Sequence, residues 1–127
     1  MSDTTEQSIR VNVSAHYVEG QSEPTRHRYV FSYTITITNL GARTAKLLSR
    51  HWIITDAEGN QQEVHGDGVV GEQPTMAPGE GFRYTSGAIL KTPVGSMQGS
   101  YTMVDDDGNT FKAPIDPFTL AVPGYLH

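Results

Sequence analysis

Gly66, Gly68 and Gly71 form a G-x-G-x-x-G pattern, which is typical of phosphate binding in dinucleotide-binding proteins. Glycine reaches positive φ easily, so successive amides can converge on an anion. The three glycines are therefore candidate ligands for a nucleotide or for pyrophosphate. The dinucleotide-binding form also needs a helix that begins at the last glycine. Pro74 and Pro78 follow too closely for that helix. We interpret the glycines as shaping a long loop between strands, with anion binding as the alternative.

The charge around these glycines does not favour an anion. Asp67 and Glu72 stand within or beside the pattern, and no lysine or arginine lies between Arg50 and Arg83. Phosphate binding here would need a bridging Mg²⁺ ion to offset the acidic side chains.

His65 and Asp67 are the candidate ligands for direct binding of a divalent metal. They are two residues apart, and such residues on a strand share one face of the sheet. The five histidines of the chain show none of the short spacings of a zinc motif. The alternative interpretation is an ordinary surface histidine. The acidic run 105–107 has oxygen ligands suited to Mg²⁺ or Ca²⁺, and its alternative is a polar hairpin turn.

No catalytic residue stands out in the sequence. The chain has no cysteine and no G-x-S-x-G nucleophile motif. We therefore predict a protein that is not an enzyme and that needs no cofactor, with hydrolysis of phosphate compounds as the alternative activity.

Strands must position all of these residues. The clearest signal spans 29–39, where aromatic and aliphatic residues alternate with hydroxyl-bearing ones. The same alternation covers 11–17 and 82–88. Segment 46–55 is rich in apolar residues, but they do not all fall on the same face of a two-residue alternation. We expect its Trp52 to lie in the core.

Turn-forming residues separate the strands. Residues 56–60 and 105–109 predict hairpins. The second hairpin joins strands at 100–104 and 110–115. Pro117 is expected to end the preceding strand. A last short strand then follows at 118–122, and we expect it at a sheet edge or after a bulge.

Seven to eight short strands and no helical period predict an all-β fold. We expect an immunoglobulin-like or fibronectin type III-like antiparallel β-sandwich. Residues 1–8 are expected to be a flexible N-terminal segment and residues 9–127 a single domain. At 127 residues the chain is long enough to bury a core of its own.

Composition limits the classes of partner. The net charge is −5, and the second half is strongly acidic, so we expect no nucleic-acid binding. No apolar run reaches the length of a membrane span and no signal peptide is visible, so we expect no membrane partner and a cytoplasmic location.

A protein partner is the expected ligand. Sandwich domains bind partners through loops and strand edges. Val69, Val70, Pro74 and Met76 on the glycine-rich loop are the candidate contacts, because apolar residues there have no assured core partner. The C-terminal stretch 122–127 is similar. The alternative is that these side chains fold back over one end of the sandwich.

Six segments also carry a family resemblance. They are 47–56 (LLSRHWIITD), 64–74 (VHGDGVVGEQP), 78–79 (PG), 82–87 (FRYTSG), 97–101 (MQGSY) and 115–120 (IDPFTL). These segments resemble the ApaG family, and the likeness covers nearly the whole chain after Ser8. Asp116 departs from the family pattern, which more often has a second proline there.

The resemblance implies a small bacterial cytoplasmic protein with a fibronectin type III-like sandwich. The family is named for a gene beside a diadenosine tetraphosphate hydrolase, and it is linked to cobalt resistance and magnesium efflux. Related domains in eukaryotic F-box and DNA-polymerase-interacting proteins look like protein-interaction modules. No enzymatic activity is established for the family. We therefore predict a non-enzymatic interaction or regulatory module whose partner is unknown, linked to cobalt and magnesium homeostasis.

Overall fold

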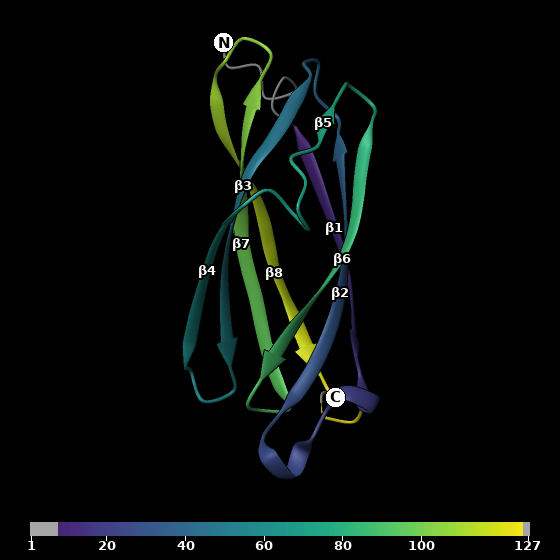
Figure 1. Ribbon diagram of the computed structural model, residues 1–127, viewed down its shortest axis with the longest axis vertical. Coiled ribbons are helices and arrows are strands. Elements are labelled where there is room, and N and C mark those ends of the chain that lie inside the picture. The colour runs from purple at the N-terminus through teal and green to yellow at the C-terminus, as the bar shows by residue number, and fades with distance from the viewer. Residues whose placement is uncertain (1–7, 126–127) are drawn as a thin grey trace.

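Two antiparallel β-sheets face each other across a common core (Figure 1). The computed structural model describes residues 8–125. The strands are β1 (Ile9–Tyr17), β2 (Tyr29–Asn39), β3 (Ala45–Asp56), β4 (Gln61–Asp67), β5 (Thr75–Met76), β6 (Gly81–Leu90), β7 (Val94–Asp105) and β8 (Thr110–Ala121). Two single-turn 3-10 helices, η2 (Glu19–Gln21) and η3 (Pro24–Arg26), lie between β1 and β2.

The smaller sheet has the strand order β1-β2-β6, and the larger has the order β4-β3-β7-β8 with β5 paired to the start of β3. Every strand pair is antiparallel. The predicted antiparallel β-sandwich is confirmed. Of the expected flexible segment 1–8, residues 1–7 lie outside the described part of the chain. Within the described part, no helix is long and apolar enough to cross a bilayer.

The core lies between the sheets and is anchored by Trp52. The alternating residues Phe31, Tyr33, Ile35 and Ile37 of β2 are buried, as their period predicts. Trp52 projects from β3 in the opposite sheet, and its ring centroid lies 5.5 Å from that of Tyr33. This edge-to-face aromatic contact joins the two sheets.

A β-bulge in β3 explains why this segment keeps no single phase. The pairing with β7 shifts between Leu47 and Ser49, which leaves Leu48 as an extra residue. Before the bulge Leu47 faces the core, and after it the even-numbered Trp52 does. A bulge of this kind exchanges the faces of the residues that follow. His51 is consequently placed on the outer face of the larger sheet.

The C-terminal part corrects the prediction of two separate strands. A single strand, β8, runs through Pro117, and its ladder with β7 is irregular between Met97 and Gly99. Because β8 lies at the edge of its sheet, a proline removes no ladder bond to a further strand. The strand β8 therefore continues past Pro117, which lies at a bulge in the ladder.

Candidate functional site

The glycine-rich loop follows β4 and folds into a tight hairpin. The Val69 amide donates to the Glu72 carbonyl at 2.8 Å, and the Glu72 amide donates back to the Val69 carbonyl at 2.9 Å. Val70 and Gly71 are therefore the two central residues of the turn. Their φ values are 43° and 82°, and two positive values are the pattern of a type I′ turn.

Val70 is unusual at this position. Asn and Gly dominate type I′ turns, because a β-branched side chain is strained at positive φ. Of the described residues, only His27 and Val70 adopt positive φ without being glycine. The side chain of Val70 is 54% exposed, whereas its neighbour Val69 is fully buried. The hairpin is thus fixed to the core by one valine and presents the other to solvent.

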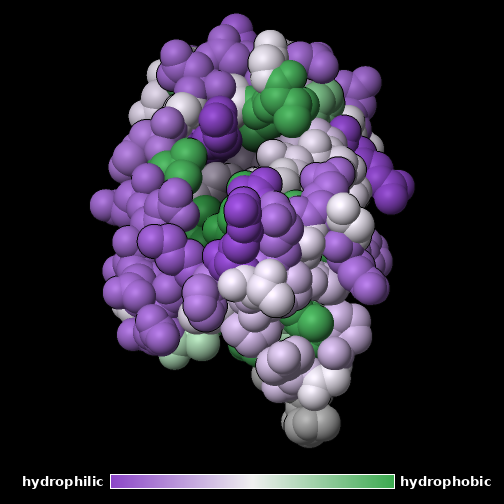
Figure 2. Space-filling model, turned by 60° about the horizontal axis from the view of Figure 1, so that its bottom comes forward, coloured by the Kyte–Doolittle hydropathy of each residue, from purple (hydrophilic) through white to green (hydrophobic). Residues whose placement is uncertain are grey.

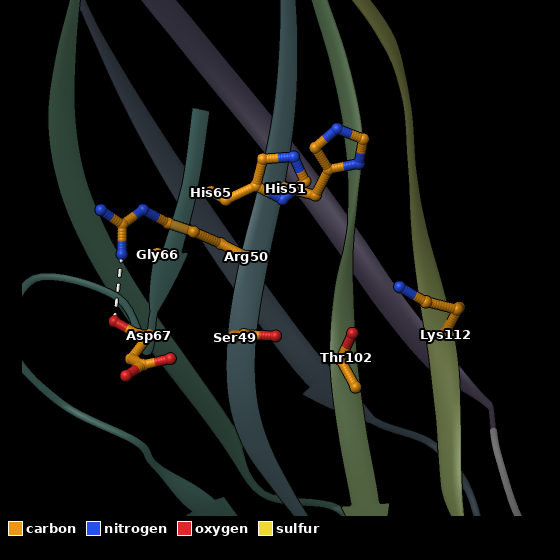
Figure 3. A pocket seen from close by; sticks show the side chains of 8 residues that line it. All are labelled: Ser49, Arg50, His51, His65, Gly66, Asp67, Thr102 and Lys112. Atoms are coloured by element: carbon orange, nitrogen blue, oxygen red, sulfur yellow. Dashed lines mark hydrogen bonds between the residues drawn. The ribbon is translucent and has the colours of Figure 1, made fainter. Parts of the chain in front are cut away.

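Arg50 fixes the base of this hairpin. Its guanidinium donates to the carbonyl of Asp67 at 3.1 Å (Figure 3). It also donates to the carbonyl of Gly68 at 2.9 Å. It lies directly against Gly66, where an added Cβ would stand 2.7 Å from the Arg50 Cζ atom. A further hydrogen bond holds the base of the hairpin: the Gly68 amide donates to the carbonyl of Leu48 at 2.8 Å.

Two glycines of the G-x-G-x-x-G pattern, Gly68 and Gly71, meet a structural requirement, and the third, Gly66, lies against the flexible end of a side chain. Gly66 leaves room for the Arg50 guanidinium. Gly68 has a φ of 61°, and a Cβ there would lie 2.2 Å from the Glu72 carbonyl oxygen. Gly71 supplies the second positive φ of the turn. The amides of Gly68, Val69 and Glu72 donate to carbonyls of the chain itself, so these three amides do not point toward a bound anion.

A shallow cavity of about 370 Å³ lies beside the base of the loop (Figure 3). Its lining comes from β3, β4, β7 and β8. The lining residues are Ser49, Arg50, His51, His65, Gly66, Asp67, Thr102 and Lys112. Apart from Gly66 every one of them carries a polar side chain, and Lys112 adds a cation on the β8 side.

Two histidines meet on this outer face. His51 of β3 is the direct ladder partner of His65 of β4. Their rings stack with centroids 4.2 Å apart and planes 10° from parallel. Glu63 lies two residues before His65, and its Oε2 atom is 2.7 Å from the His51 Nε2 atom. One ligand atom from each of the three residues lies within 4.8 Å of the others.

Comparisons with known proteins show the family to which this fold belongs. A model of the ApaG domain matches residues 19–105. The chain belongs to the ApaG family. It is 57% identical to protein ApaG of Photobacterium profundum over 127 residues, which is 100% of both chains. It is 58% identical to protein ApaG of Shewanella sediminis, over 96% of this chain and 97% of that one.

A solved structure in the same family extends the match to three dimensions. The crystal structure of the putative ApaA protein from Bordetella pertussis is 52% identical in sequence. It superposes with a TM-score of 0.90, over 92% of this chain and 95% of that one. The resemblance to the ApaG family found in the sequence is confirmed.

The ApaG-family loop presents only part of the apolar surface that the sequence suggests. Val69 and Met76 belong to the buried core, so their side chains are not available to a partner. Pro74 is half-buried, and its carbonyl accepts the Leu47 amide at 3.0 Å. Val70 alone of the four predicted contacts is exposed. In the C-terminal stretch, Tyr125 is exposed, and residues 126–127 lie outside the described range.

The structure also groups the candidate metal ligands differently from the sequence prediction. His65 clusters with His51 and Glu63, and Asp67 is not part of that cluster. Sequence reasoning missed His51 and Glu63 because they approach His65 only through the register of the β3–β4 hairpin. The turn at 56–60 contains the signal that could have revealed them, since its length fixes which residues pair.

The acidic run 105–107 is engaged within the chain. Asp105 Oδ1 accepts the amides of Asp107 and Asn109, which shapes the hairpin turn. Asp106 and Asp107 both form ion pairs with Arg43. These contacts support the interpretation of this segment as a polar turn.

Three tyrosines, Tyr33, Tyr84 and Tyr101, are buried in the core. The Tyr84 and Tyr101 hydroxyl oxygens are 2.5 Å apart, so one hydroxyl donates to the other. Burial raises the pKa of both side chains above the usual value, and burial likewise raises the pKa of Tyr33. The folded state therefore favours the neutral phenols.

These raised pKa values predict alkaline sensitivity. Below pH about 10, the ordinary tyrosine pKa, the phenols are neutral in both states and their contribution to stability is constant. Above it the unfolded chain loses protons first, so the free energy of unfolding should fall as pH rises. Urea unfolding between pH 8 and 11 measures this slope. The double variant Tyr84→Phe/Tyr101→Phe should show a shallower fall, and an unchanged slope would refute the assignment.

Proposed function

We propose that this chain is a non-enzymatic protein-interaction module whose recognition element is the hairpin tip at Val70 and Gly71. The observation that carries the proposal is an apolar, β-branched residue held at positive φ with its side chain in solvent. Strain of this kind persists only where the surrounding structure enforces it, and it gathers at functional sites.

The surroundings of the tip enforce the strained conformation. Arg50 holds the two carbonyls before the turn, and the buried Val69 side chain fixes the hairpin to the core. A pre-organised loop loses little conformational entropy when it binds. The Arg50 contacts therefore hold the tip in a fixed conformation before a partner binds.

The rest of the surface offers little broad apolar area. On the face seen in Figure 2, hydrophobic side chains form small patches separated by hydrophilic ones. The large hydrophobic residues that are exposed in the described part of the chain are Leu40, Val70, Ile89 and Tyr125. A surface of this kind suits recognition through the exposed Val70 side chain together with the free edge of strand β4. The strand β4 leads into the hairpin and lies at the edge of its sheet.

Under this proposal the hairpin tip does not itself carry the family's association with cobalt and magnesium. The exposed valine offers a hydrophobic contact and no metal ligand. Binding of a nucleotide or pyrophosphate is not proposed, because three amides of the loop donate to the chain's own carbonyls.

Replacing Val70 with asparagine should stabilise the folded chain. Asparagine tolerates positive φ, so the variant relieves strain worth about 1 kcal/mol without changing the turn. Chemical denaturation of both proteins measures the difference. A Val70→Asn variant less stable than the parent would show that the exposed valine packs favourably and is not strained.

The same variant tests the proposal itself. The intact chain, Val70→Asn and Ile89→Asn serve as baits for affinity capture from a lysate of the native organism. Ile89 is the matched control because it is 49% exposed on a different strand. Proteins held by the parent and by Ile89→Asn, but lost from the stabilised Val70→Asn, support recognition at the hairpin. Equal capture by all three baits, or no specific capture by the parent, would overturn it.

A further inference from the structure

We propose that His51, Glu63 and His65 form a binding site for a divalent transition-metal ion on the outer face of the β3–β4 hairpin. The cluster combines two imidazoles and one carboxylate, with a ligand atom of each within 4.8 Å of the others. This site is independent of the recognition element at Val70.

The backbone brings the three side chains together. His51 and His65 are directly opposed across the antiparallel ladder, where Cβ atoms are about 4.5–5.5 Å apart. Glu63 shares a face with His65 because the two are two residues apart on β4. Its carboxylate already contacts the His51 ring at 2.7 Å. The turn at the other end of the hairpin is fixed by Asp56, whose Oδ1 atom accepts the amides of Glu58 and Asn60. Two paired strands and a fixed turn thus set the spacing of the ligands.

The donor set determines which ions fit. Imidazole nitrogen suits Zn²⁺, Ni²⁺ and Cu²⁺, whereas Mg²⁺ and Ca²⁺ prefer oxygen ligands. Zinc binds nitrogen and oxygen ligands at about 2.0–2.2 Å, which places the ligand atoms of a tetrahedral site roughly 3.3 Å apart. The ligand atoms lie within 4.8 Å of one another at present, so they must come closer together to reach that spacing. Three protein ligands also leave a coordination position open to water.

One rearrangement is required for binding. In the stacked pair the two rings are nearly parallel, so their nitrogens cannot both point at a single ion. Rotation of the rings about their side-chain bonds brings the nitrogens to a common point. Glu63 and His65 are exposed and His51 is half-buried, so solvent rather than packed core surrounds the moving groups. The stacked arrangement, with His51 hydrogen-bonded to Glu63, is then the metal-free form of the site.

The test is calorimetric titration of the full chain with ZnCl₂ and separately with NiCl₂ and MgCl₂. We expect saturable 1:1 binding of zinc and nickel and no response to magnesium. His51→Gln and His65→Gln should each weaken zinc binding by about tenfold or more, since each removes a nitrogen ligand. The double variant His16→Gln/His27→Gln is the matched control, because it removes two exposed histidines outside the cluster and should bind like the parent.

Nuclear magnetic resonance distinguishes a shared site from separate surface histidines. Zinc should shift the ring signals of His51 and His65 together at one concentration. In His51→Gln the shift of His65 should move to higher concentration by the same factor seen in calorimetry. Absence of saturable zinc binding by the parent would overturn the proposal, as would undiminished affinity in His65→Gln.

Discussion

Replacing Trp52 with alanine is expected to lower the free energy of unfolding by about 3–5 kcal/mol. The indole is buried and makes edge-to-face contacts with Tyr33, Tyr101 and Phe118, so it joins both sheets and the edge strand β8. Its removal leaves a cavity that neighbours on two sheets cannot close. Urea unfolding followed by circular dichroism gives the value.

A surface variant calibrates the Trp52 result. Ile89→Ala also shortens a large apolar side chain, but on the outer face of β6 where it is half exposed. It should change stability by about 0.5 kcal/mol or less. A loss for Trp52→Ala as small as that of Ile89→Ala would show that the two sheets do not depend on the indole.

Replacing Gly68 with alanine should be the most damaging change within the loop. The backbone there has a φ of 61°, which is strained for alanine by about 1–2 kcal/mol. The added methyl group would also stand 2.2 Å from the Glu72 carbonyl oxygen, which is backbone and cannot swing aside. The variant must therefore open the Val69–Glu72 bonds of the hairpin.

Gly71→Ala is the matched control for Gly68→Ala. Gly71 also has a positive φ, of 82°, but an added Cβ meets nothing within 4 Å. This variant carries the conformational strain alone. The difference in unfolding free energy between the two variants measures the clash at Gly68, and faster amide hydrogen exchange at Val69 and Glu72 should accompany it. Equal destabilisation and equal exchange would mean that the hairpin is not held as described.

Much of the fold could be predicted from local pattern. The alternation of 29–39 predicts a strand with a buried odd face, and β2 has that form. The hairpin turn at 105–109 also predicts the strands it joins, β7 and β8. At Pro117 the sequence predicts a break beside a sheet edge or a bulge. The structure has the edge and the bulge but not the break, because an edge strand needs no amide of Pro117 for a further strand.

The candidate site was less accessible to sequence reasoning. The pairing of His51 with His65 depends on strand register, and the bulge at Leu48 decides which face His51 occupies. Val70 has no local signal either, since turn rules expect asparagine or glycine at its position. Its conformation is imposed by the Arg50 contacts and by the burial of Val69, which only the folded chain provides.

The most direct measurement of the proposed recognition is site-specific photo-cross-linking in cells of the native organism. A benzophenone side chain replaces Val70 in one version of the full chain and Ile89 in another. Recognition at the hairpin predicts a discrete cross-linked protein species from position 70 that is missing from position 89. No cross-linked species at position 70, or the same species from both positions, would contradict the account.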